Sequence, residues 1–384
     1  MSFARHAPAG RRVPRAALSS RPRVAATQLW PGVRVGLFDS GTAALGHALR
    51  FAFAANATPP ANRVVLLPAY ACPNLVAAAL WAGAVPQYYD LARDTLGPGP
   101  GVLDELRRTG NAVMVHVDAF GADTLPLLPS LGNGVRGRLV HDLAQSFAPY
   151  SPEWRPRFPF SVLSSGRAKP VSLTLGGILL TESGAAEPGS VEIPDAPASD
   201  LSVWKWRLRT AVYSLSLHPL VFGVLARIPA LEIGQTRFTP LTVAGRLPER
   251  WVRIFRTAAA DARDSFTAFS RQTAAMLQLA RDSGVSVPAS ALQTQGRAPL
   301  WRVPILCPTP ESAMTLAREG THLGISRLYV KTLPEIMGVP RADVLACWPN
   351  AAWIAERLVT LPTHGRLGER LEDGLRHLLA TQMR

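Results

Sequence analysis

The sequence predicts an α/β protein with a largely parallel β-sheet. From Val33 onward, short apolar runs typical of buried strands alternate with stretches whose apolar residues recur at helical spacing. The 34 prolines and 30 glycines indicate many short elements joined by turns, and 384 residues are enough for a large domain with a smaller one. Strands separated by helices imply βαβ units, in which ligands bind at the carboxyl ends of the strands.

The elements follow one another in a regular order. Strands are predicted at 34–38, 63–70, 85–90, 111–120, 136–144 and 176–183, and helices at 43–55, 73–84 and 101–110. Residues 1–30 are expected to form an irregular arm, and residues 31–200 a large domain that ends in the linker-like stretch 184–200. A smaller α/β domain is predicted at 246–384, with a long helix at 248–284, a strand at 300–308, a helix at 310–324 and a last helix near the C-terminus.

The segment 201–245 connects the two domains, and its first part, 201–233, is unusually apolar. Prolines interrupt it and arginines lie within it, so a single membrane-spanning helix is not expected. Two readings remain: an element lying on a membrane surface, or a buried packing or dimer-contact element, of which the second is favoured.

Charge and cysteine usage narrow the class of protein. The formal net charge is +14 at pH 7, but basic residues are scattered along the whole length, so a nucleic-acid partner is not expected. Cys72, Cys307 and Cys347 lie far apart without CxxC spacing, which argues against a disulfide framework and against a zinc site and fits the reducing cytoplasm. No apolar stretch follows the arginine-rich N-terminus, so a cleaved secretory signal is not expected.

The stretch "SGTAAL" (40–45) lies between a predicted strand and a predicted helix. A turn of this kind presents backbone N–H groups and hydroxyls at the positive end of the helix, which suits a phosphate group. Taken alone, Ser and Thr at this place are better explained as ordinary helix caps.

Two further positions carry chemistry. Asp142 stands at the end of a buried strand, where it is either a capping residue or a carboxylate that holds a protonated heteroaromatic nitrogen. Lys169 is one of only three lysines among 41 basic residues, and small residues flank it. An amine can lose its proton and attack a carbonyl, whereas a guanidinium cannot, so Lys169 is either a Schiff-base lysine or a surface residue.

These signals become specific in combination. A phosphate cradle, a strand-end aspartate and then a lysine on one sheet are what pyridoxal phosphate requires: donors for its phosphate, an anion for its ring nitrogen and an amine for its aldehyde. Tyr70, in "PAYACPN", is placed to lie over the cofactor ring. No metal is expected in this site.

The same motifs resemble those of the DegT/DnrJ/EryC1/StrS family of sugar aminotransferases, which depend on pyridoxal phosphate and have fold type I. "DSGTAALGHALRFAF" is similar to the family's "SGTAALHLAL", "VHDLAQSFA" to "IEDAAQAHG", and "SSGRAKPVSLTLGGILLT" to "SFYPTKNLTTGEGGMVVT". Further likenesses lie at 64–96, 113–122 and 355–367, so the resemblance covers nearly the whole chain from about residue 33.

The resemblance implies a role for each site residue. Lys169 would bond to the cofactor aldehyde and later act as the base, Asp142 would pair with the pyridinium nitrogen, and Gln145 would lie beside the phenolic oxygen. Tyr70 would stack on the ring. The residues implied to hold the phosphate are Gly41, Thr42 and Ser164.

The resemblance also implies a reaction and an assembly. It implies a large domain with a mixed, mostly parallel sheet, a smaller C-terminal α/β domain, and a homodimer. The implied reaction moves an amino group, usually from glutamate, to a keto group on a nucleotide-linked sugar, in surface-polysaccharide or secondary-metabolite biosynthesis.

Several alternatives stay open. A dehydratase would keep the cofactor, but its branch of the family typically has His in place of the lysine; a non-catalytic, membrane-associated scaffold would bind none. The family's Asn-x-Arg-Met element, whose Asn reaches the partner subunit's phosphate, has its nearest counterpart at 234–241, where Gln235 or Thr236 would stand in for Asn.

Overall fold

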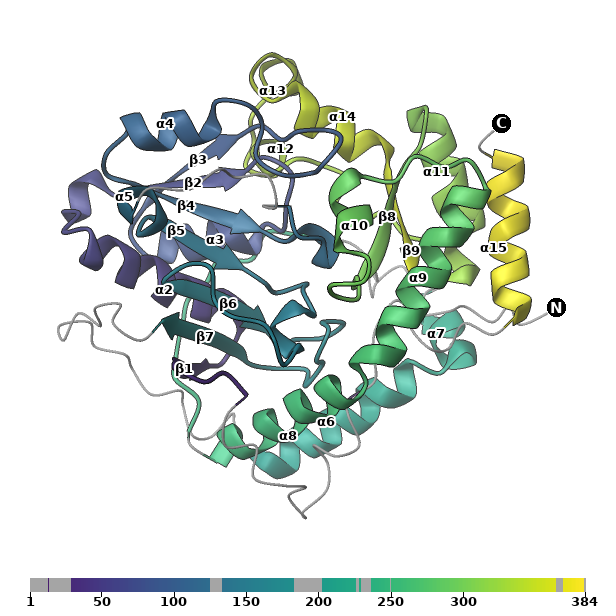
Figure 1. The fold of residues 1–384 in the computed structure, drawn as a ribbon, viewed down its shortest axis with the longest axis horizontal. Coiled ribbons are helices and arrows are strands. Elements are labelled where there is room, and N and C mark those ends of the chain that lie inside the picture. The colour runs from purple at the N-terminus through teal and green to yellow at the C-terminus, as the bar shows by residue number, and fades with distance from the viewer. Residues whose placement is uncertain are drawn as a thin grey trace.

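The computed structural model describes residue 13 and residues 29–124, 133–182, 202–225, 228, 236–248, 250–363 and 369–382. Most of the predicted N-terminal arm, the linker at 184–200 and Gln235 lie outside these residues. Figure 1 shows a seven-stranded sheet on the left, a second group of helices around two strands on the right, and α6 with α8 along the lower edge.

The large sheet is mixed and mostly parallel, as predicted. Only β7 runs against its neighbours: it pairs antiparallel with β1 and β6, whereas β6, β5, β4, β2 and β3 pair parallel. In sheet order the strands are β1 (Val33–Phe38), β7 (Gly177–Glu182), β6 (Phe160–Ser164), β5 (Leu139–Asp142), β4 (Ala112–Val117), β2 (Val64–Pro68) and β3 (Val85–Tyr89).

Alternate residues of the strands point to opposite faces, and helices bury both faces. The helices of this part are α2 (Gly41–Ala55), α3 (Asn74–Trp81), α4 (Val102–Arg108) and α5 (Asn133–Arg136). Val65 and Leu67 pack with α2 and α3, whereas Leu66 packs with α4 on the other face. Burial on both faces explains why these strands read as continuous apolar runs.

The second group holds the smaller antiparallel sheet and most of the remaining helices. The two strands are β8 (Arg302–Leu306) and β9 (Leu358–Pro362). The helices that follow residue 246 in the chain are α8 (Arg250–Asp264), α9 (Phe266–Asp282), α10 (Ala289–Thr294), α11 (Pro310–Glu319), α12 (Leu333–Ile336), α13 (Arg341–Cys347), α14 (Pro349–Arg357) and α15 (Glu369–Gln382). Of these, α8 lies beside α6 along the lower edge and α12 packs against the large-sheet part (Figure 1). Single 3₁₀ turns lie at Pro60–Asn62, Ala119–Gly121, Ala148–Tyr150 and Thr321–Leu323.

The observed elements differ from the predicted ones in several places, among them the short helices α5, α10, α12, α13 and α14, which the sequence did not predict. Strands β6 and β9 were not predicted from the sequence. The expected helix over 248–284 is two helices separated by Ser265, whose N–H still bonds to Asp261 O at 3.0 Å. The large sheet lies within 31–200 and the small sheet within 246–384, while the boundaries between these domains stay predictions.

The apolar segment after residue 201 forms α6 (Val203–Ser216) and α7 (Pro219–Leu225). Among the described residues no single helix is long and apolar enough to cross a membrane, whereas α6 and α7, bent by 91° at the break between them, pass that test of length and composition as a pair. Trp206 and Thr210 are buried, and the Trp206 ring meets Trp251 of α8 edge-on at 5.4 Å. The opposite face of α6 is exposed and apolar, with Trp204 69% exposed.

Candidate active site

Two cavities meet at the carboxyl ends of the parallel strands. The larger, of about 420 Å³, is lined by Gly41, Thr42, Asp142, Ser164 and Lys169. The smaller, of about 40 Å³, is lined by Tyr70 and Gln145 and again by Asp142 and Lys169. The structure therefore brings all seven predicted site residues together around two cavities that share Asp142 and Lys169 in their lining.

The turn before α2 forms a tight backbone cradle. Ser40 is the N-cap of α2, and its Oγ accepts a hydrogen bond from Ala43 N at 3.1 Å. A Cβ on Gly41 would lie 2.7 Å from Ser164 Cβ, and a Cβ on Gly177 would lie 2.1 Å from Ser40 O. Only glycine lets the turn approach the ends of β6 and β7 this closely. Ser40 is thus an ordinary helix cap. The same turn presents the N-terminus of a 15-residue helix to the cavity.

Asp142 is the last residue of β5 and is buried. Its Oδ1 accepts a hydrogen bond from Ala144 N at 2.8 Å. Burial raises the pKa of Asp142, although this hydrogen bond and the charge of Lys169 act in the opposite direction. Among the described residues no Lys, Arg or His nitrogen lies within ion-pair distance of this carboxylate. A buried carboxylate of this kind suits a cationic ligand group such as a protonated ring nitrogen.

Lys169 lies in the loop between β6 and β7, and distant residues fix that loop. Ala168 has a φ of 62°, a left-handed conformation that non-glycine residues rarely adopt. Its carbonyl accepts a hydrogen bond from Trp301 Nε1 at 2.7 Å, and its N–H donates to Tyr213 Oη at 3.0 Å. Lys169 Nζ lies 5.8 Å from the centre of the Trp301 ring. The lysine is therefore held at the site by α6 and by the residue before β8.

Gln145 and Tyr70 are joined through a residue that was not predicted, Tyr329. Gln145 Oε1 accepts from Phe120 N at 2.8 Å, and its Nε2 donates to Tyr329 Oη at 3.0 Å. The rings of Tyr329 and Tyr70 meet edge-on, with centroids 5.5 Å apart. These contacts fix the Gln145 amide and the Tyr70 ring along one wall of the smaller cavity.

The unpredicted site residues carry weak sequence signals. Trp301 and Tyr329 belong to the small-domain part of the chain, far from the other motifs in sequence. Thr236, considered above as a stand-in for the family's Asn, donates instead to Leu328 O of its own chain at 2.9 Å.

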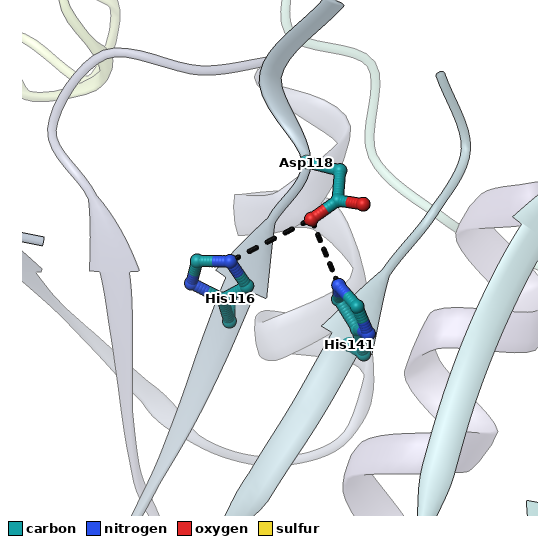
Figure 2. A group of neighbouring side chains, drawn as sticks. All are labelled: His116, Asp118 and His141. Atoms are coloured by element: carbon teal, nitrogen blue, oxygen red, sulfur yellow. Dashed lines mark hydrogen bonds and ion pairs between the residues drawn. The ribbon is translucent and has the colours of Figure 1, made fainter. Parts of the chain in front are cut away.

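A second polar cluster lies at the ends of β4 and β5 (Figure 2). His141 Nε2 is 2.9 Å from Asp118 Oδ1, and His116 Nε2 is 3.7 Å from the same oxygen and 2.9 Å from Thr124 Oγ1. All three members are buried, and their ligand atoms lie close enough together to be weighed as a metal site. The sequence predicts no metal.

The hydrogen bonding favours a cluster held together by hydrogen bonds over a metal site. Both Nδ1 atoms are buried without a hydrogen-bond partner in the part of the chain that the structure describes. A histidine that binds a metal through Nε2 carries its proton on Nδ1 and donates it, and here neither Nδ1–H would find an acceptor. With the protons on Nε2, His141 donates to Asp118 and His116 to Thr124. Burial opposes ionisation of Asp118, but the two histidines outweigh it and hold the pKa of Asp118 below its usual range.

Comparison with known proteins bears on the fold. No protein-family model and no curated protein matches the chain. Among solved structures, a Streptococcus pneumoniae protein assigned as sugar aminotransferase Spr1654, in its PMP form, is 16% identical with a TM-score of 0.61, over 99% of this chain and 98% of that one. A DegT DnrJ EryC1 StrS aminotransferase from Brucella abortus is 16% identical with a TM-score of 0.55, over 91% and 86%.

A third match is 3-amino-5-hydroxybenzoic acid synthase, 15% identical with a TM-score of 0.59, over 91% of this chain and 86% of that one. The S. pneumoniae protein also matches in its PLP form, with a TM-score of 0.55. Matches at 15–16% sequence identity show a shared fold. The chain therefore has the fold of the PLP-dependent, DegT/DnrJ/EryC1/StrS-type aminotransferases, fold type I, as its motifs predict.

Proposed function

We propose that the protein is a pyridoxal-phosphate-dependent aminotransferase that acts on a keto sugar. One observation carries this: Lys169, the buried Asp142 carboxylate, which forms no ion pair with any residue that the structure describes, and a glycine-lined helix N-terminus line one cavity on this fold. These three parts match the aldehyde, the ring nitrogen and the phosphate of the cofactor. The residues that line this cavity therefore fit pyridoxal phosphate.

The residues of the site divide the work. The cofactor, when bound, would supply an aldehyde to accept the amino group and a ring to delocalise electrons. Gly41, Thr42 and Ser164 would bind the phosphate, and the Asp142 carboxylate would hold a proton on the ring nitrogen. Lys169 Nζ would take a proton from the carbon that bears the amino group and deliver it to the cofactor carbon within the same half-reaction, and would carry out the reverse transfer in the second half-reaction. Tyr70 would cover the ring.

The finer assignments rest on the resemblance of the sequence motifs to the DegT/DnrJ/EryC1/StrS family. In this proposal glutamate donates the amino group, the acceptor is nucleotide-linked, and the product enters surface-polysaccharide or secondary-metabolite biosynthesis. Three unpaired cysteines support a cytoplasmic location. The presence of Lys169 favours transamination over the dehydratase alternative.

The test is spectroscopic. After incubation with pyridoxal phosphate and removal of the excess, the protein is expected to be yellow. Addition of glutamate alone should remove the absorbance band that makes the protein yellow and release one 2-oxoglutarate per site. This is expected because the first half-reaction needs no keto-sugar acceptor. Absence of the band would favour the scaffold alternative, and a band unchanged by glutamate would overturn the choice of donor.

We also propose that the exposed apolar face of α6 is a dimer contact. Four large side chains form this face: Trp204, Leu208, Val212 and Leu215, between 53% and 69% exposed. Their spacing of four, four and three residues makes one continuous helical stripe. A contiguous exposed apolar stripe marks an interaction site. A second copy of the chain is the first candidate partner, and a membrane is the second.

Light scattering separates the two partners. The proposal expects twice the chain mass of 41.3 kDa without lipid, and a fall to the monomer mass for the double variant Leu208→Asp, Val212→Asp. Lys205→Gln, on the same helix, serves as the control. A monomer that co-sediments with phosphatidylserine vesicles would instead support the membrane contact.

A further inference from the structure

Two arginines line the larger cavity and are not explained by the site described above. Arg167 lies in the loop after β6, two residues before Lys169, and Arg209 lies on α6. Neither forms an ion pair with Asp or Glu within the described ranges of the chain, and neither lines the smaller cavity beside Tyr70 and Gln145. They therefore lie on the side of the site that holds Gly41, Thr42 and Ser164.

The placement of Arg209 follows from the way α6 is anchored. Trp206 Nε1 donates to Leu173 O at 2.7 Å, and Tyr213 Oη accepts from Ala168 N at 3.0 Å. Residues 206, 209 and 213 are spaced three and four positions apart, so they share one face of the helix. Because two of them contact the loop of residues 165–173, the third must face the same loop. Arg209 is therefore directed to the cavity by contacts on both sides of it.

The two positive charges are close enough to oppose each other. Both side chains are exposed at the cavity, and partial desolvation together with the charge of Arg167 lowers the pKa of Arg209. Solvent weakens the repulsion between two exposed arginines, and an anion bound between them would replace it with attraction to both. Guanidinium groups bind phosphate oxygens in a bidentate manner, so phosphate is the ligand that this pair fits best.

The other lining groups on this side agree with an anion. The N-terminus of α2 contributes the positive end of its dipole, and Thr42 and Ser164 contribute hydroxyls. Asp39 is a carboxylate there, but its Oδ1 accepts from Ser40 Oγ at 3.2 Å and its Oδ2 from Gly245 N at 3.1 Å, and burial raises its pKa. The cavity is therefore cationic near Gly41 and anionic at Asp142.

We propose that Arg167 and Arg209 complete the phosphate-binding site of the cofactor from within the same chain, with Arg209 supplied by α6. This inference rests on the proposed function, because it assigns the phosphate to pyridoxal phosphate. It gives the apolar segment 201–233 a second role: α6 carries a phosphate-binding side chain on the face opposite its apolar stripe.

The experiment compares cofactor binding with and without the phosphate. The variants are Arg209→Gln and Arg167→Gln, with Arg207→Gln as the control, since Arg207 is exposed on the same helix and does not line the cavity. Absorbance titrations measure the affinity for pyridoxal 5'-phosphate and for pyridoxal. Arg209→Gln is expected to weaken binding of the phosphate form by about tenfold or more, the loss typical of one charge-assisted hydrogen bond, and to leave pyridoxal binding unchanged. Arg207→Gln should change neither.

If Arg209→Gln weakened the binding of pyridoxal 5'-phosphate and of pyridoxal equally, the proposal would be overturned, because the arginine would then only hold the loop in place. The proposal would also be overturned if Arg209→Gln and Arg167→Gln both bound pyridoxal 5'-phosphate and pyridoxal as tightly as the unsubstituted protein.

A second measurement separates this inference from the proposed function. Inorganic phosphate should raise the melting temperature of the cofactor-free protein, and Arg209→Gln should reduce that rise. Stabilisation by phosphate that depends on Arg209, in a protein that binds no pyridoxal phosphate, would support the anion site and overturn the proposed function. Stabilisation by phosphate that persists at saturating pyridoxal phosphate would place the arginine pair in a separate anion site and overturn the assignment.

Discussion

Replacing Lys169 with arginine is expected to abolish covalent attachment of the cofactor and to lower the transamination rate by about 10²- to 10⁴-fold, the range for loss of a general base. Arginine keeps the positive charge, but its guanidinium does not lose a proton under these conditions and cannot bond to the aldehyde. Borohydride reduction of the loaded protein followed by peptide mass spectrometry gives the measurement. The label should appear on the peptide that contains Lys169.

The chain offers matched controls, because its other lysines are few. Lys205→Arg and Lys331→Arg change exposed lysines outside the cavity and should keep both the label on Lys169 and the activity. Full activity in Lys169→Arg, or a label on Lys205 or Lys331 of the unsubstituted protein, would contradict the assignment.

Replacing Asp142 with asparagine is expected to change activity and stability in opposite directions. Activity should fall by about 10²- to 10³-fold, the range for removing one pre-organised electrostatic group. The cofactor-free protein should become more stable at pH 7, by an amount on the order of 1 kcal/mol, because asparagine removes a buried charge that has no ion-pair partner among the described residues. Urea denaturation of the cofactor-free protein measures the second effect.

The sign of the pH dependence follows from the raised pKa of Asp142. In the folded state its carboxyl group binds a proton more tightly than in the unfolded state, so stability falls as the pH rises through the folded-state pKa. The advantage of Asp142→Asn should therefore be present at pH 7 and shrink as the pH falls toward the ordinary value for aspartate, about 3.9.

Asp118→Asn is the matched control, since Asp118 is buried at the end of the neighbouring strand but has a lowered pKa. Its contribution to stability is present above the ordinary aspartate pKa and is lost in acid, so removal of the charge should destabilise the protein at pH 7. Destabilisation by both substitutions would show that Asp142 has a cation partner in the free protein.

Local patterns predicted much of the fold, and they failed where the local signal was weak. β6 follows a proline-rich stretch and contains two serines, Ser161 and Ser164, so it lacks an apolar run. β9 begins at Leu358, directly after α14 ends at Arg357, so no turn residue marks the change from helix to strand. Both strands are stabilised by pairing with partners distant in sequence, which no local window contains.

The sequence by itself determined the parallel sheet, the turn at 40–42, the strand-end Asp142 and the lysine at 169, because each depends on a short pattern of neighbouring residues. In the structure these groups line one cavity. Only the tertiary structure decided what surrounds them: Gln145 meets Tyr329 across 184 positions, Trp301 holds the Lys169 loop across 133, and Arg209 turns toward that loop. The physical reason is that hydrogen bonds and burial act through space, and these partners are neighbours only after the chain has folded.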